Sequence, residues 1–488
     1  MTVPATPTEP APPPTTPLAA RLTSLAVASA LMMEFIDSTS LSTALPTLAK
    51  AFDADPVHLK LALTSYILAL AVFVPISGWA SERFGARRVF LAAMAVFLTG
   101  SVLCGFSTSL PQLVAFRILQ GMGGAMMTPV ARLIVVGSTP REQLIKAMGW
   151  FTMPALIGPL IGPPLAGFVL AVADWPWIFW LNVPVGLLGM AAVMKFVPDL
   201  CSPDPGRFDW SGFLLSATAI TGLVAVAETA GLGLVPLPLQ LGLLLLAVGC
   251  GLAYLHLARH KVRPILDLTL LRYPTFRASV LGGSFVRLGI GATPFLMPLL
   301  LQVGLGWSPL QAGSVTLAGG LGVLCARPVA IVVLRRIGFR ASLILFVILS
   351  AALTAVPALF SDETPIPLIM VLLFLTGFCR SNQFIAANTI AYADIPNEKV
   401  AAASTLSAVT QQIGLALGVS FGGLMLGLTR GLGADGASEA ALRPDAFALP
   451  FLAIGLVTLM AAPVYLALDP RAGANMSGHG QDSSGGKL

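Results

Sequence analysis

Long apolar stretches alternate with short polar turns along almost the whole chain. Turns containing acidic residues and proline separate many of them, such as Asp53–Pro56 and Asp362–Pro365. A helix that spans a membrane needs about 20 mostly apolar residues, and fourteen stretches meet that length. The pattern therefore predicts an all-α integral membrane protein with spans near 22–48, 57–79, 88–107, 110–136, 143–172, 175–197, 210–230, 236–258, 275–302, 308–333, 340–360, 365–391, 400–428 and 446–468.

The composition supports a protein that lives in lipid. The chain has 488 residues, of which 56% are hydrophobic and 10% are charged, whereas a soluble protein carries about 25% charged residues. The net charge of +6 is not gathered into a basic cluster with aromatic residues, so no nucleic-acid partner is expected. The cysteines and histidines show no metal-ligand spacing, and no phosphate-binding loop is present. We therefore expect neither an enzyme nor an ATP-driven pump.

The basic residues are distributed unevenly between the gaps that separate the predicted spans. Because cytoplasmic loops of membrane proteins are enriched in Lys and Arg, the even-numbered gaps and both termini are expected on the cytoplasmic side of the membrane. The N-terminal segment 1–20 is rich in Pro and Thr, and the C-terminal segment 471–488 is rich in Gly and Ser. Both are expected to be disordered cytoplasmic tails. The odd-numbered gaps hold few basic residues, whereas the even-numbered gaps hold Arg83, Arg87, Arg88, Arg141, Lys146, Lys195, Arg207, Arg259, Lys261, Arg263, Arg272, Arg335, Arg336 and Arg340.

Two halves of the chain repeat the same features in the same order. Shifted by 253 residues, Arg83, Gly85 and Arg87 coincide with Arg336, Gly338 and Arg340, and a similar shift aligns 157–162 with 413–418. Such internal symmetry is typical of transporters. The repeat predicts an N-terminal six-helix bundle at 21–198 and a C-terminal six-helix bundle at 274–470. The segment 199–273 between them is expected to be a linker with two extra transmembrane helices.

Four motifs carry a resemblance to a known family. They are the charged segment 78–88, the fourth-helix segment 117–125, the Gly/Pro segment 158–164 and the first-helix segment 37–46; Trp177–Gly186 adds a fifth similar segment. Together they resemble the major facilitator superfamily, in particular its fourteen-span drug:proton antiporters. The resemblance covers about residues 22–468 and implies two six-helix bundles with an inserted two-helix hairpin.

The resemblance also implies an activity. We expect a proton-coupled antiporter that exports small organic molecules across the inner membrane by alternating access, with protons as coupling ion and no cofactor. Its expected partners are the lipid bilayer and a small-molecule substrate, and the chain is expected to be monomeric. A periplasmic adaptor with an outer-membrane channel is left open. The alternatives are a proton-coupled importer of small organic acids and a membrane sensor without transport.

Two acidic residues in the first span are candidates for proton coupling. An ionised carboxylate inside a bilayer is costly, so Asp37 and Glu34, one helical turn apart, are expected to be functional. The resemblance makes Arg117 of the fourth span the partner of Asp37. A proton-coupled cycle needs a balance between the two charges that can shift. The structural alternative is a static buried ion pair that fixes packing.

The remaining motif residues are expected to pack helices or to gate access. The resemblance implies that the fifth span packs closely on the small residues of 318–322. It also implies that the segment 78–88 bonds across to the other half as a cytoplasmic latch, although Glu82 stands where the family has Asp. The residues given these packing and gating roles are Gly78, Glu82, Arg83, Gly85, Arg87, Arg88, Gln120, Gly121, Gly158, Pro159, Gly162, Pro163, Arg336, Gly338 and Arg340.

The second half carries intramembrane arginines without deep acidic residues. Arg287, Arg327 and Arg380 fall inside apolar segments, with Arg327 able to reach toward the cytoplasmic end. Guanidinium groups bind carboxylate and phosphate, so Arg287 and Arg380 predict a cavity for substrates with an anionic group. Glu228 is expected at the membrane interface. Candidate cavity amides, which could equally join helices to one another, are Asn382, Gln383, Asn388, Gln411 and Gln412.

Overall fold

The computed structural model describes residues 17–139, 143–198, 208–230, 235–261, 264–432 and 443–473. These residues form helices and the turns between them, with no strand among them. Most of the two predicted tails lies outside this part of the chain, as do Arg141, Arg207 and Arg263. The first helix begins at Pro17, so the last residues of the predicted 1–20 tail are helical.

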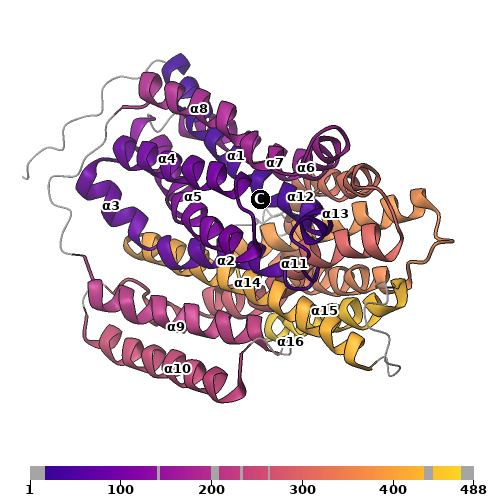
Figure 1. Ribbon diagram of the computed structural model, residues 1–488. Helices are drawn as coiled ribbons and strands as arrows, with labels where there is room; N and C mark the ends of the chain where they lie inside the picture. Colours follow the sequence, from indigo (N-terminus) through magenta and orange to yellow (C-terminus); the bar gives the residue numbers. More distant parts are fainter. Residues whose placement is uncertain are drawn as a thin grey trace, which may run out of the picture.

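The first half contains six spans, one of them bent and one interrupted. The second span bends by 57° at a break around Pro75, because proline removes an amide donor from the helix. The helices of this half are the indigo to magenta ribbons of Figure 1. They are α1 (Pro17–Ala51), α2 (Lys60–Phe73), α3 (Ile76–Phe84), α4 (Ala86–Gly105), α5 (Leu110–Ser138), α6 (Leu144–Val172), α7 (Trp177–Trp180) and α8 (Asn182–Phe196).

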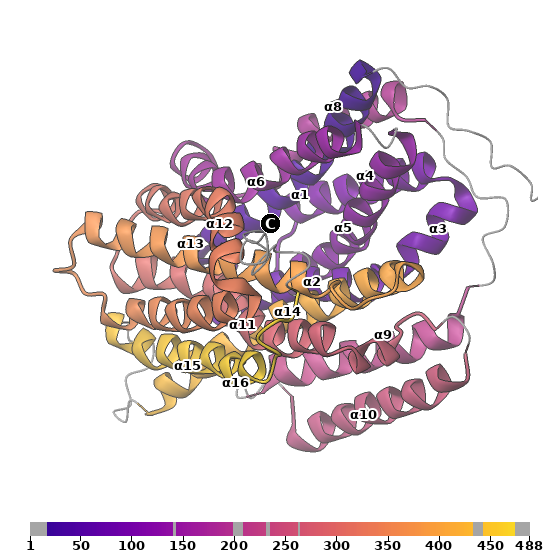
Figure 2. The ribbon, with the colours of Figure 1, turned by 180° about the vertical axis from the view of Figure 1, so that it is seen from behind.

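A two-helix hairpin connects the halves. It consists of α9 (Trp210–Thr229) and α10 (Leu237–His260). The two helices pack on each other, and α9 also packs on α2 of the first half and on α14 of the second. Both views show α10 as the outermost helix, with α9 between it and the rest of the protein (Figures 1 and 2). The hairpin therefore contacts both halves through α9.

The second half repeats the arrangement. Its tenth and eleventh spans form one helix that is kinked at Gly338. This helix has 47 residues and would be about 70 Å long if straight, more than twice the apolar thickness of a bilayer. The elements of the second half are η2 (Leu268–Arg272), α11 (Pro274–Leu299), the π-helical η3 (Leu300–Gly304), α12 (Pro309–Ala355), η4 (Val356–Leu359), α13 (Ile366–Ile390), η5 (Asn397–Lys399), α14 (Val400–Leu432), η6 (Pro444–Phe447), α15 (Ala448–Leu459) and α16 (Ala461–Leu466). The 47-residue helix is α12.

The number of spans agrees with the sequence pattern. Within the described ranges, twelve helices and one bent pair are long and apolar enough to cross a membrane. Because the kinked α12 contains two spans, the structure is consistent with fourteen. The prediction of an all-α membrane protein is confirmed.

The charged turn of the first half has a structural counterpart in the second half. Gly85 has φ 91° and Gly338 has φ 75°, a backbone region that other residues rarely adopt. Two residues later, the Nη2 atom of Arg87 donates to the carbonyl of Met194, and that of Arg340 donates to the carbonyl of Leu466. Each carbonyl belongs to the last span of its own half. The repeat seen in the sequence is thus a repeat of backbone geometry and of hydrogen bonding.

The second repeated segment packs in the same way in both halves. In α6, a Cβ atom at Gly158 would lie 2.7 Å from the Cβ of Phe35 in α1. In α14, a Cβ atom at Gly418 would lie 2.3 Å from the carbonyl oxygen of Leu288 in α11. Glycine at these positions lets two helices approach closely. The segments 157–162 and 413–418 therefore join equivalent helix pairs.

The halves share an apolar core at one end of the molecule. We call this the Asp53 end, after the turn between α1 and α2, and the opposite one the Gly85 end. Near the Asp53 end, Leu48 and Leu63 of the first half belong to one buried cluster with Leu300 and Phe451 of the second. Toward the Gly85 end, two of the buried clusters in the described residues each belong to one half. The halves are thus packed together at the Asp53 end.

The fifth span also packs across the boundary between the halves. A Cβ atom at Gly313 of α12 would lie 2.4 Å from the carbonyl oxygen of Pro163 in α6, and one at Gly320 would lie 2.7 Å from Leu160. The predicted contact of this motif with the tenth span is therefore present. Only part of the 318–322 segment takes part, because Gly319 and Gly322 face α13 instead.

Candidate functional site

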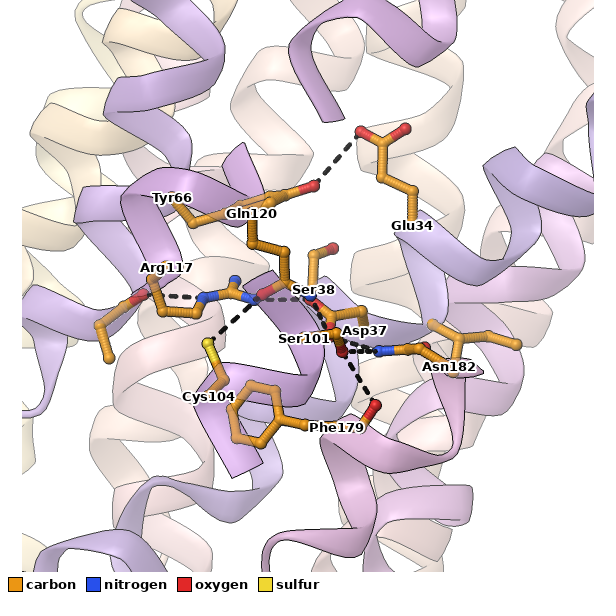
Figure 3. A network of polar contacts seen from close by, with 12 residues as sticks. Glu34, Asp37, Ser38, Tyr66, Ser101, Cys104, Arg117, Gln120, Phe179 and Asn182 are labelled. Atoms are coloured by element: carbon orange, nitrogen blue, oxygen red, sulfur yellow. Dashed lines mark hydrogen bonds and ion pairs between the residues drawn. The ribbon is translucent and has the colours of Figure 1, made fainter. Parts of the chain in front are cut away.

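Asp37 lies near the middle of α1 and is surrounded by polar groups from other helices. Its Oδ2 atom accepts a hydrogen bond of 2.6 Å from Arg117, and Oδ1 accepts bonds of 3.0 Å from Gln120 and 2.7 Å from Asn182. The residue is 1% exposed. A buried carboxylate needs such partners, because an isolated charge in an apolar interior is very costly. The network in Figure 3 therefore gives both carboxylate oxygens of Asp37 partners inside the helix bundle.

Arg117 of α5 is enclosed even more completely. Besides Asp37, its guanidinium donates to Gln120 Oε1 at 2.6 Å and to the carbonyl of Ala62 at 3.3 Å. The guanidinium carbon lies 4.2 Å from the ring centre of Tyr66, which is a cation–π arrangement. The side chain is fully buried, yet its Nη2 has no hydrogen-bond partner. The ion pair predicted between Asp37 and Arg117 exists, and the two N–H donors of Nη2 are left over.

Glu34 joins the same network through Tyr66. The tyrosine hydroxyl donates to Glu34 Oε1 at 3.4 Å, a long hydrogen bond. The other carboxylate oxygen is buried without a hydrogen-bond partner. Figure 3 marks the bond of Tyr66 with Glu34, and the ring of the same tyrosine lies against Arg117. Glu34 is thus connected to Asp37 through Tyr66 and Arg117, and the Glu34 carboxylate is only partly satisfied.

Several members of this network were missed or given another role by the sequence. Gln120, expected to help helix packing, instead bridges Asp37 and Arg117. Asn182, in the similar segment 177–186, binds Asp37 and the hydroxyl of Ser101, which in turn donates to the carbonyl of Phe179. The interrupted sixth span, with its polar Asn182 amid aromatic residues, was the signal that could have located it.

Two buried arginines of the second half, Arg287 and Arg380, have no carboxylate partner within the described residues. Arg287 of α11 is 3% exposed and its Nη1 has no hydrogen-bond partner. Arg380 of α13 donates to the hydroxyls of Thr293 at 2.8 Å and Thr354 at 3.0 Å. Arg327 is exposed. Hydroxyl groups satisfy hydrogen bonds but do not balance a charge, so Arg287 and Arg380 leave positive charge within this half.

The candidate amides of this half are mostly engaged with the protein itself. Gln383 donates to the hydroxyl of Tyr465 at 2.9 Å. Asn382 donates to the carbonyl of Phe378 and Asn388 to that of Phe384, each within its own helix. The carbonyl oxygen of the Asn382 side chain is buried without a partner. Gln411 and Gln412 are half-buried on α14.

One side chain of the charged segment 78–88 bonds within its own half. Glu82, Arg83 and Arg88 are exposed, while Arg87 reaches the carbonyl of Met194 in α8. The expected bond from this segment to the other half stays a prediction. The segment lies at the Gly85 end, whereas the halves share their apolar core at the opposite, Asp53 end.

The fourth-helix motif also serves packing. A Cβ atom at Gly121 would lie 2.7 Å from both the Cβ of Ala69 and the carbonyl of Tyr66, so α5 approaches α2 closely. This contact brings Tyr66 over Arg117. Gly78, by contrast, is exposed, and a Cβ atom there would meet nothing within 4 Å.

A second buried ion pair lies at the Asp53 end. Lys60 of α2 and Glu228 of α9 are 3.3 Å apart, with side chains 0% and 5% exposed. Ser420 of α14 donates to the other carboxylate oxygen of Glu228 at 2.7 Å. Glu228 was expected at the membrane interface; it lies in the last turn of α9, which turns this side chain toward the bundle.

Comparisons with known proteins agree with this architecture. The family model described as Major Facilitator Superfamily matches residues 27–266 and 279–483. A protein of Klebsiella pneumoniae that carries the multidrug-resistance name MdtD is 36% identical over 457 residues, covering 92% of this chain and 95% of its own length. An MdtD protein of Pectobacterium carotovorum is 37% identical over 403 residues, covering 82% and 86%.

Solved structures show the same fold. The chain resembles the crystal structure of the POT family transporter PepTSo with a TM-score of 0.69 and 14% identity, covering 93% of this chain and all of that one. It resembles a bacterial homologue of the human lysosomal transporter Spinster with a TM-score of 0.61 and 16% identity, covering 92% and 97%. The protein is a multi-pass membrane transporter, not an enzyme, and it belongs to the multidrug efflux family of the major facilitator superfamily.

Proposed function

We propose that this transporter exports small organic molecules across the bacterial inner membrane in exchange for protons, with both termini in the cytoplasm. The observation that carries the proposal is the buried pair of Asp37 and Arg117, whose nearest atoms are 2.6 Å apart. An ionisable pair inside a membrane bundle is expensive and is typical of proton relays. The multidrug-resistance name of the MdtD relatives supports the export of drug-like compounds.

The geometry suggests how a proton is coupled to movement. Protonation of Asp37 from the periplasmic side removes the negative charge that holds Arg117. Arg117 then retains Gln120, the carbonyl of Ala62 and the ring of Tyr66 as partners. These groups come from α2 and α5, so the contact between α1 and the other helices weakens selectively. Glu34, bonded to Tyr66, is the second carboxylate that responds to this change.

The positive charge of the second half bears on substrate choice. Because Arg287 is buried and has an unpartnered Nη1, we propose that a substrate with an anionic or zwitterionic group completes its interactions. This part of the proposal is independent of the proton site. The two are therefore tested separately.

The proton site is tested with purified protein in a proton-release assay across a ligand library. Asp37→Asn should abolish ligand-induced proton release, because the amide cannot carry the proton. The matched control is Asp394→Asn, which changes an acid in the turn after α13 that accepts a bond from Thr275. Full coupling in Asp37→Asn would refute the proton site. Substrate flux toward the cytoplasmic side of the protein in oriented vesicles would favour the importer.

Substrate charge is tested by transport of matched anionic and cationic compounds. Arg287→Gln should lower transport of anions about tenfold or more and leave cations largely unchanged, since charge-assisted hydrogen bonds to a carboxylate are strong. Arg327→Gln, which removes an exposed arginine of the same half, is the control. Equal anion transport by the wild type and Arg287→Gln would end this part of the proposal.

A further inference from the structure

The inserted hairpin contributes a buried acid at the place where three parts of the molecule meet. Glu228 belongs to α9 of the hairpin, Lys60 to α2 of the first half and Ser420 to α14 of the second half. One carboxylate oxygen faces Lys60 at 3.3 Å, and the other accepts the serine hydroxyl at 2.7 Å. A single side chain thus connects both halves through the hairpin.

The neighbouring helix is shaped to hold the lysine. A Cβ atom at Gly423 of α14 would lie 2.5 Å from Cδ and 2.9 Å from Nζ of Lys60. The lysine stem therefore lies directly against the backbone of the second half, where any side chain at Gly423 would displace it. Lys60 is fully buried although it is the first residue of α2.

Local helix electrostatics oppose both charges. Lys60 is at the N-terminus of α2, where the helix dipole favours an anion, and Glu228 is in the last turn of α9, where it favours a cation. Burial adds a desolvation cost that an ion pair seldom repays in stability. Neither charge is explained by its own helix, so their mutual contact across the helices is what makes them tolerable.

The pair is located where opening must occur. The halves share their apolar core at the Asp53 end, and Lys60, at the start of α2, and Glu228, in the last turn of α9, are both at this end. In a protein that opens alternately to two sides, α2 and α14 must separate here. That movement breaks either the contact of Glu228 with Lys60 or its bond to Ser420.

We propose that Glu228 of the inserted hairpin, through Lys60 and Ser420, is a lock that holds the Asp53 end closed. The hairpin is then an active part of the transport cycle rather than a passive filler between the halves. The lock depends on transport by alternating opening but neither on Asp37 as proton carrier nor on the charge of the substrate.

The test measures opening of the Asp53 end directly. Spin labels are attached at Ala51→Cys and Asp362→Cys, two exposed positions at this end, one in each half. The full chain, with its five native cysteines replaced, is reconstituted in lipid nanodiscs. The distance between the labels is measured by double electron–electron resonance spectroscopy. Glu228→Gln should raise the ratio of long to short distances about tenfold. The closed state becomes less populated when a contact that stabilises only this state is removed.

A charge-swapped variant and a hairpin control complete the test. Lys60→Glu combined with Glu228→Lys should return the distances to the wild-type distribution, because it restores the pair and suits both helix dipoles. This variant also decides the question if Glu228→Gln alone does not fold. Lys261→Met, which removes the ion pair with Asp209 inside the hairpin, should leave the distances unchanged. An unchanged distribution in Glu228→Gln, a shift in Lys261→Met, or no return in the swap would each overturn the lock.

Discussion

Asp37 and Arg117 balance each other inside the first half, whereas Arg287 and Arg380 have no carboxylate partner within the described part of the second half. The same scaffold carries both arrangements. Shifted by 253 residues, the acidic Glu34 coincides with the basic Arg287, so the repeat keeps the helix packing while reversing a charge. A site whose positive and negative charges neutralise each other is suited to a proton switch within the protein. A site with excess positive charge is suited to binding an anionic substrate. The following experiments try to break or sharpen that division, beginning with the largest expected effect.

Removing Arg117 should destabilise the protein strongly. Arg117→Gln leaves the buried Asp37 without its countercharge, and loss of one partner of a buried pair costs about 3–5 kcal/mol. Thermal unfolding in detergent measures the effect. Adding Asp37→Asn to the same protein should recover much of the lost stability without recovering transport. Recovery of transport by the double variant would show that the pair is structural.

Removing Arg380 should cost less than removing Arg117. Arg380→Gln abolishes hydrogen bonds to two threonine hydroxyls but leaves no acid unpaired, so we expect a loss of about 1–3 kcal/mol. The same unfolding assay compares the two variants. An equal or larger loss for Arg380 would mean that the second half contains a hidden countercharge.

Closing the space at Gly162 should weaken the packing of α6 on α1. A Cβ atom there would lie 1.9 Å from the hydroxyl of Thr39, and overpacking costs about 1–3 kcal/mol. Gly149→Ala is a control in the same helix, since a Cβ atom at Gly149 meets nothing within 4 Å. Unfolding temperatures should fall for Gly162→Ala alone. Equal effects of both variants would place the cost in the helix itself rather than in the contact.

The smallest effect on stability is expected from removing the ion pair between Asp209 and Lys261, at the hairpin ends near the Gly85 turn. Burial tends to raise the pKa of Asp209, but bonds from Lys261, the Gly212 amide and Ser211 outweigh it and hold this pKa below its ordinary value. The pair therefore stabilises the fold above the unfolded pKa of about 3.9 and ceases to do so as the pH falls through the lower, folded pKa. Lys261→Met should cost about 0.3–1 kcal/mol at pH 6. The difference from the wild type should shrink as the pH falls below about 3.9 in denaturant titrations.

The sequence predicted what depends on periodicity and on strong single signals. The spans and the paired charged turns could be predicted from the residue pattern. The contact of Asp37 with Arg117 was predicted from the resemblance to the family. Asn182 was missed because its role depends on where an interrupted helix places it. Lys60 and Glu228 were missed for another reason. Each is at the end of a span, where a charge normally faces water, and only the packing of three distant helices buries them.

The two glycines with left-handed backbone have a consequence for how the gene can vary. At Gly85 and Gly338 the strain of a side chain does not depend on available space, since it arises from the backbone itself. Every missense change at these codons therefore carries a similar penalty, whatever the residue introduced. A saturation map of the coding sequence should show two matching intolerant positions, 253 codons apart, each preceded by an exposed residue, Phe84 or Ile337, that accepts most substitutions.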